Sequence, residues 1–218
     1  MRVRMYPQKK SLVCLSLFIL LFCGGTAAGA DDNLEAIDHY NKAVDLAYEG
    51  KLLLALNETD QALQMNQDFT LAYVTRAGIL NSLGRYNNSI DASDRAISLN
   101  PNQSAAWNNR AYALIHMERY AEGLDAADRA TTLDPSLTEA WINKGTALIA
   151  LGRYQEALTA SENALLIDPS SEEAKKNRET AQEAILEVPA TKAPLPIHII
   201  LEASGIAGAS VIFLRMRK

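Results

Sequence analysis

The sequence predicts an all-α fold: a solenoid of stacked helix pairs, followed by a single membrane-spanning helix. Three observations carry this prediction. The segment LGRYNNSIDASDRAISLNP at residues 83–101 recurs in related form at 117–135 and at 151–169, each time 34 residues further on. Apolar residues inside each copy recur at helical spacing. Residues 195–214 form a 20-residue stretch, mostly apolar, which is long enough to cross a bilayer as a helix.

Residues 1–30 have the organisation of a secretory signal peptide. Basic residues begin the chain, the apolar run SLVCLSLFILLFC follows, and TAAGA supplies small residues up to Ala30. We expect cleavage after Ala30. An uncleaved signal anchor is an alternative, and a lipoprotein acylated at Cys23 is disfavoured because bulky Phe22 precedes it. Cys14 and Cys23 are the two cysteines of the chain, so the cleaved protein would have no disulfide.

The acidic charge is concentrated between the two ends of the chain. The whole sequence has 21 basic and 26 acidic residues, a net charge of −5. The first 30 residues hold four of the basic residues, and residues 195–218 hold three more with one acidic residue. The middle therefore has 14 basic and 25 acidic residues, a net charge of −11. Such a surface does not suit a phosphate backbone, and we expect no nucleic-acid partner.

The repeat divides the middle of the chain into four units: 36–69, 70–103, 104–137 and 138–171. Each unit has two stretches with helical periodicity. Between them lies a residue suited to a left-handed turn, a glycine in three units (Gly50, Gly84 and Gly152). Glu118 takes this place in the third unit, which we expect to cost about 1 kcal/mol or to alter the turn. Prolines end the second helix of the last three units (Pro101, Pro135 and Pro169).

The fourth unit, TEAWINKGTALIALGRYQEALTASENALLIDPSS, closely resembles a tetratricopeptide repeat. Its matching residues are Trp141, Gly145, Tyr154, Ala157, Ala164 and Pro169. The third unit matches with Trp107, Ala111, Tyr120, Gly123, Ala130 and Pro135, and the second with Tyr73, Ala77, Tyr86, Ser89, Ala96 and Pro101. The first unit is degenerate: it keeps Ala43, Gly50, Ala55 and Ala62, but has Leu52 for the tyrosine and Gln67 for the proline. The resemblance covers 136 of the 218 residues.

This resemblance implies a right-handed α-solenoid of four tetratricopeptide helix pairs that binds a protein or peptide in its concave groove. In the family, places 2, 5, 9, 12 and 13 of the first helices line that groove. The predicted groove residues here are Tyr40, Val44, Val74, Asn81, Asn108, Tyr112, His116, Ile142 and Thr146, with Ile115 and Ile149 beside them. Aromatic residues carry much binding energy, so Tyr40, Tyr112 and His116 are the preferred contacts. The Lys, Asn and Arg residues that clamp a chaperone's C-terminal carboxylate in some family members are absent.

The part of the chain after the repeats predicts a cap and an anchor. Residues 172–187 form an amphipathic stretch that suits a capping helix, and 188–194 read as a proline-containing linker. Residues 195–214 follow as the transmembrane helix, and the basic tail 215–218 is the expected cytoplasmic flank. Glu202 is unusual inside such a helix. It is interpreted as a tolerated polar residue, as a contact with a partner membrane helix, or as a sign that the segment does not span.

No pattern in the sequence predicts an enzyme, a metal site or a cofactor. The histidines His39, His116 and His198 are far apart, and no HExxH or CxxC motif is present. The acidic groups DASD and DAAD lie on the second helix of their units, where a solvated outer face explains them. N-x-S/T triplets at Asn57, Asn87 and Asn102 are candidate glycosylation sites. We expect no cofactor and no small-molecule substrate.

These features together favour a non-enzymatic protein-interaction scaffold displayed on the outer face of a membrane. Its repeats would lie outside the cytoplasm, at the cell surface or in a periplasm-like space. Two alternatives remain open: a structural or adhesive spacer of the cell envelope, and an accessory subunit of a membrane complex recruited through Glu202. Groove substitutions would release the partner of a scaffold and leave a spacer unaffected.

Overall fold

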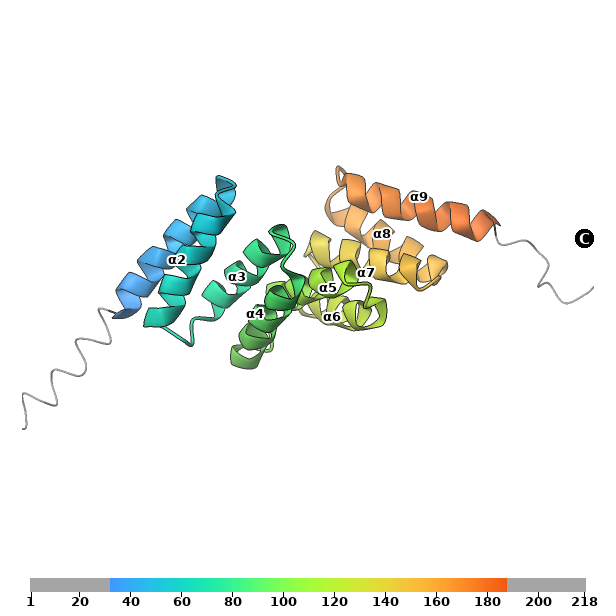
Figure 1. The fold of residues 1–218 in the computed structure, drawn as a ribbon. Coiled ribbons are helices and arrows are strands. Elements are labelled where there is room, and N and C mark those ends of the chain that lie inside the picture. Colours follow the sequence, from blue (N-terminus) through green and yellow to red (C-terminus); the bar gives the residue numbers. More distant parts are fainter. Residues whose placement is uncertain (1–31, 188–218) are drawn as a thin grey trace, which may run out of the picture.

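The computed structural model describes residues 32–187, and every regular element in that range is a helix (Figure 1). A helix over residues 32–48 is followed by α2 (Leu52–Met65), α3 (Thr70–Ser82), α4 (Tyr86–Leu99), α5 (Ser104–His116), α6 (Tyr120–Leu133), α7 (Thr138–Ala150), α8 (Tyr154–Ile167) and α9 (Glu172–Glu187). The all-α prediction is confirmed. The helices succeed one another along a solenoid, with α9 packed on α7 and α8 at its end.

Several predicted segments lie outside the described residues. These are the signal peptide at 1–30, the linker at 188–194, the transmembrane helix at 195–214 and the basic tail at 215–218. Within residues 32–187, no helix combines the length and the apolar character that a membrane crossing requires. The predicted unit boundaries stay predictions, although each helix pair from α3 to α8 begins and ends inside one predicted unit.

The turn inside each unit has the same backbone geometry in all four copies. Gly50, Gly84 and Gly152 have positive φ angles of 74°, 69° and 71°, and Glu118 adopts 60° at the equivalent place. The turn after α5 keeps the hydrogen bonds of the turn after α3: the N–H of residue 118 donates to Ile115 at 2.9 Å, as Gly84 does to Asn81. Glu118 therefore accepts the left-handed conformation, and the turn is not altered.

The core is built from small residues that repeat every 34 positions. Small residues are buried at recurring positions of the helix pairs, and units two, three and four each add one fully buried leucine (Leu80, Leu114 and Leu148). Gly123 of α6 shows how tight this packing is, because an added Cβ would lie 2.8 Å from Cγ1 of Ile115. Small residues thus let the helices stack at short range.

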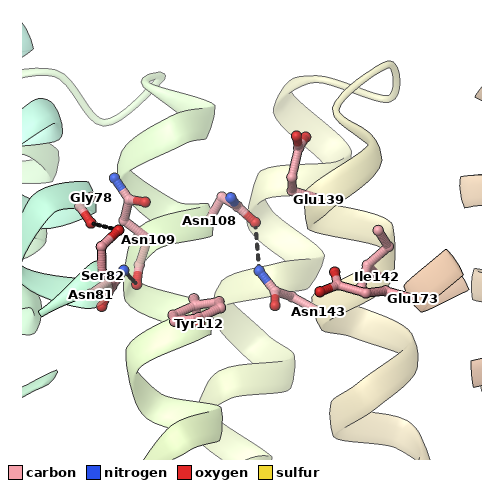
Figure 2. A pocket seen from close by; sticks show the side chains of 10 residues that line it. All are labelled: Gly78, Asn81, Ser82, Asn108, Asn109, Tyr112, Glu139, Ile142, Asn143 and Glu173. Atoms are coloured by element: carbon pink, nitrogen blue, oxygen red, sulfur yellow. Dashed lines mark hydrogen bonds between the residues drawn. The ribbon is translucent and has the colours of Figure 1, made fainter. Parts of the chain in front are cut away.

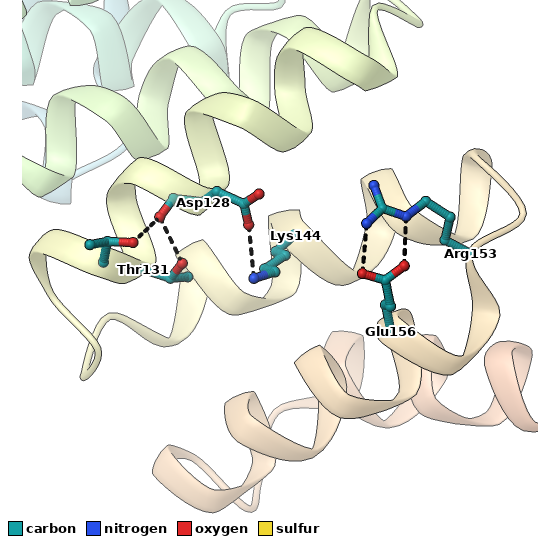
Figure 3. A network of polar contacts seen from close by, with 6 residues as sticks. Asp128, Thr131, Lys144, Arg153 and Glu156 are labelled. Carbon is teal, nitrogen blue, oxygen red and sulfur yellow. Dashed lines mark hydrogen bonds and ion pairs between the residues drawn. The ribbon is translucent and has the colours of Figure 1, made fainter.

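Ion pairs join neighbouring units at the same 34-residue interval. Asp60 pairs with Arg76, Asp94 with Arg110 and Asp128 with Lys144, each at 2.8 Å between charged atoms. Figure 3 shows the last of these pairs, with the Arg153–Glu156 pair beside it. The DASD and DAAD groups are therefore not simply a solvated face, because one aspartate of each group binds the first helix of the following unit.

Candidate functional site

The first helices of units two, three and four and the cap line an open pocket of about 360 Å³. We call it the central pocket. Its lining comes from α3, α5, α7 and α9 and comprises Gly78, Asn81, Ser82, Asn108, Asn109, Tyr112, Glu139, Ile142, Asn143 and Glu173 (Figure 2). Three consecutive units and the cap contribute to it, so stacking the repeats is what creates it.

Asparagines spaced by 34 residues hold these helices in register. Asn109 donates to the backbone carbonyl of Val74 at 3.0 Å, and Asn177 of the cap donates to that of Ile142 at 3.2 Å. Between them, Asn143 donates to Oδ1 of Asn108 at 2.8 Å. Each bond links a first helix to the first helix of the unit before it. Asn109 and Asn143 therefore have a structural role, and the same pattern extends into α9.

Asn81 leaves an acceptor without a donor at the edge of this network. Its Nδ2 donates to the carbonyl of Asn109 at 3.0 Å, which fixes the orientation of the amide because a carbonyl only accepts. Asn81 is 7% exposed, and its Oδ1 has no hydrogen-bond partner among the described residues. Buried amide oxygens without a donor are uncommon, and this one belongs to a residue that lines the central pocket.

The charges around the central pocket are all negative. Glu139 and Glu173 are exposed and line it, and the lining includes no Lys, Arg or His. Figure 2 shows the Glu173 carboxylate extending from α9 toward the middle of the pocket. Partial burial raises the pKa of Tyr112, with smaller contributions from Tyr86 and from the Glu173 carboxylate. Tyr112 therefore stays neutral and can offer its hydroxyl and its ring to a ligand.

A second pocket, of about 380 Å³, lies in the first unit. We call it the N-terminal pocket. It is lined by Tyr40, Val44, Ala47, Tyr48 and Thr75, and it carries no charged side chain. Tyr48 is 89% exposed, whereas Tyr40 packs against Phe69 with 5.0 Å between ring centroids. The groove thus has an apolar, aromatic part at one end and a polar, acidic part toward the other.

The structure divides the predicted groove residues between several places. Asn81, Asn108, Tyr112 and Ile142 line the central pocket, and Tyr40 and Val44 line the N-terminal pocket. The three preferred aromatic contacts do not form one cluster: His116 lies against Tyr112, with 4.2 Å between ring centroids, and stacks on Tyr86 at 5.0 Å. Tyr40 is in the other pocket.

The remaining predicted groove residues make contacts within the fold and line neither pocket. The backbone carbonyl of Val74 accepts the Asn109 bond, and the Thr146 hydroxyl accepts from Asn177 at 3.0 Å. Ile115 is 8% exposed and belongs to the core cluster of α5 to α9, against which Ile149 also packs.

Sequence reasoning missed the two carboxylates of the central pocket. Glu139 and Glu173 occupy place 2 of the fourth unit and of the cap, a groove place in the family, so the signal was present. The candidate glycosylation residues Asn57, Asn87 and Asn102 are all exposed. Among residues 32–187, no group of three or more His, Cys, Asp or Glu side chains could hold a metal ion.

Two protein-family models match parts of this chain. A tetratricopeptide repeat model matches residues 110–174, which include most of unit three, all of unit four and the start of α9. The chain is a tetratricopeptide repeat protein. It also belongs to the family of the bacterial transcriptional activator domain, whose model matches residues 15–134, more than half of the chain. Neither of these families is described as an enzyme. Among curated proteins, no sequence matches this repeat protein.

Solved structures similar to the repeat protein share its fold. YrrB, described as a tetratricopeptide repeat protein with an unusual peptide-binding site, is 23% identical; the match covers 83% of this chain and 97% of that one, with a TM-score of 0.56. MamA is 17% identical over 66% and 94% of the two chains, with a TM-score of 0.54. The first repeat domain of Spaghetti (RPAP3), bound to the HSP90 peptide SRMEEVD, is 24% identical over 54% and 93%, with a TM-score of 0.52.

Proposed function

We propose that this repeat protein is a non-enzymatic scaffold that binds an extended segment of a partner protein in its concave groove. The observation that carries the proposal is the central pocket, about 360 Å³ in volume and built jointly by α3, α5, α7 and α9. Concave sites of this size with a few convergent polar groups are typical binding sites. The charge-free N-terminal pocket offers a second place for an apolar side chain of the same segment.

The structural neighbours support a peptide as the ligand. Spaghetti binds a peptide from HSP90, and YrrB is described by its peptide-binding site. A solenoid presents a long concave surface, which suits an extended chain better than a compact small molecule. The groove of this protein differs from a carboxylate clamp, since its central pocket has two glutamates and no basic side chain.

The same proposal places the scaffold outside the cytoplasm, on the outer face of a membrane. Its support is the sequence: residues 1–30 resemble a signal peptide, and residues 195–214 suit a membrane-spanning helix with the basic tail behind it. Alkaline extraction of membranes tests the anchor, and protease digestion of intact cells tests the side on which the repeats lie. Release by alkali, or full protection of the repeats in intact cells, would contradict this placement.

Groove binding is tested with a displayed library of dodecapeptides, selected on the full-length protein. Ser82→Trp fills the central pocket at an exposed position whose hydroxyl bonds only to the helix carbonyl of Gly78. Ser98→Trp is the matched control, because Ser98 is also exposed and bonds in the same local way to Arg95 on α4. We expect peptides to be selected by the parent and by Ser98→Trp, and to be lost with Ser82→Trp. Failure to select any peptide, or equal binding by both variants, would refute the proposal.

A further inference from the structure

We infer that the central pocket receives the cationic end of a lysine or arginine side chain from the bound segment, and that Glu139 and Glu173 determine this specificity. The inference rests on the proposed function and names the chemistry of its ligand. It follows from three features of the pocket: the use of its hydrogen-bond donors, the unpaired state of its carboxylates, and the aromatic surface beside them.

Several hydrogen-bond donors of the pocket are already used within the fold. One side-chain N–H of each of Asn81, Asn109 and Asn143 donates to a neighbouring first helix, and the Ser82 hydroxyl donates to Gly78. Acceptors are left over: the two carboxylates and the buried Oδ1 of Asn81, which has no partner among residues 32–187. A ligand group that satisfies such a site has to be rich in donors. Ammonium and guanidinium groups have several N–H donors and no acceptor.

The two carboxylates differ from the other acidic groups that face a neighbouring helix. Asp60, Asp94 and Asp128 each bind a cation of the next unit. Glu139 and Glu173, in contrast, have no ion-pair partner among the described residues. Their place in the first turns of α7 and α9 suits the helix dipole, but this effect does not require them to line one shared pocket. Two uncompensated negative charges around one cavity attract a positive ligand group.

Tyr112 completes a cation site. Its ring lines the pocket from α5, and Figure 2 shows it in front of that helix, between Asn81 and Asn143. A cation over an aromatic face gains further stabilisation. An acidic peptide such as SRMEEVD would instead bring carboxylates to a pocket lined by Glu139 and Glu173, where charge repulsion opposes binding.

The experiment uses the dodecapeptide selection together with binding titrations of the selected peptides. We expect the parent to enrich Lys or Arg over Asp or Glu. The double variant Glu139→Gln, Glu173→Gln should bind a fluorescein-labelled selected peptide about threefold to tenfold more weakly, as expected for two exposed ion pairs. The matched control is Asp91→Asn, Glu162→Gln, which removes the same charge from exposed residues of the second helices α4 and α8. It should bind as the parent does, and binding by the parent should weaken as salt is raised.

A charge exchange provides a gain of binding that misfolding cannot imitate. A peptide with Glu in place of its selected Arg should bind Glu139→Lys more tightly than it binds the parent. Selected peptides without a preference for cations, or a Glu-to-Gln double variant that binds as tightly as the parent, would overturn the inference while leaving the scaffold proposal intact. Failure to select any peptide would overturn both. If the variant Arg215→Ala, Arg217→Ala, Lys218→Ala bound the peptide more tightly than the parent, the cation would belong to this chain's own tail, contrary to the inference.

Discussion

Two glycine-to-alanine substitutions should have opposite effects on stability. Gly78 lies inside α3, and an added Cβ would meet only the side-chain amide of Asn109, at 3.8 and 3.9 Å, which is ordinary contact. Alanine in a helix interior is favoured over glycine by about 0.5–1 kcal/mol. Gly78→Ala should therefore raise the free energy of unfolding by about that amount.

Gly123→Ala has the same helical gain but no space for the methyl group. Its Cβ would lie 2.8 Å from Cγ1 of Ile115 and 3.4 Å from two backbone atoms of α5. Overpacking of this kind costs about 1–3 kcal/mol, which exceeds the helical gain. We expect a net loss of up to about 2.5 kcal/mol.

Urea unfolding of the full-length protein, followed by far-ultraviolet circular dichroism, measures both effects. The transition midpoints should move in opposite directions from that of the parent, with unchanged slopes. The comparison needs no further control, because the two variants carry the same chemical change. Equal shifts, or stabilisation by Gly123→Ala, would refute the argument that contact distance decides the sign.

Three further predictions concern the turn, the asparagine bonds and a buried charge. Glu118→Gly should raise the urea midpoint by relieving a positive φ of 60°, by up to about 1 kcal/mol; a lower midpoint would contradict this. Asn109→Ala should lower stability by about 1–3 kcal/mol, because it removes a half-buried hydrogen bond between units two and three; an unchanged midpoint would show that the bond is dispensable. Hydrogen bonds from Lys42 and then His39 lower the pKa of the buried Glu58 below its ordinary value, so its contribution is present above the unfolded pKa and is lost as the pH falls toward the folded one. Urea midpoints measured on both sides of pH 4.5 should therefore depend less on pH in Glu58→Gln, and an equal dependence would contradict the linkage.

Much of the fold was predictable because turn residues and small core residues recur at a fixed interval of 34 positions. Gly84 and Gly152 mark left-handed turns, whereas the sequence left open whether Glu118 keeps the same turn or alters it; the structure shows that it keeps it, with a φ of 60°. The ion pairs were less visible. Asp94 and Arg110 are 16 residues apart, and only the stacking of one unit on the next brings them to 2.8 Å.

The sequence predicted several residues that line the candidate site but not the carboxylates that give it its negative charge. The places that line the groove led to Tyr112 and Asn108, but the family frame does not say which places hold charge. Glu173 lies in the cap, which sequence reasoning treated as a cover and not as part of the groove. The unpaired Oδ1 of Asn81 depends on which way one amide is turned, and sequence patterns contain no information about that.

The central pocket is lined by helices that do not all touch each other. Contacts among the first helices link α3 with α5, α5 with α7, and α7 with α9, while α3 and α9 have none between them. In such a stack, stability is a sum of terms between nearest neighbours, and the ends fray first. A peptide that touches Ser82 and Glu173 at once would add a stabilising interaction between α3 and α9, which are not nearest neighbours. Occupancy would then appear in hydrogen exchange as slower opening of α9, far from most of the atoms that the peptide covers.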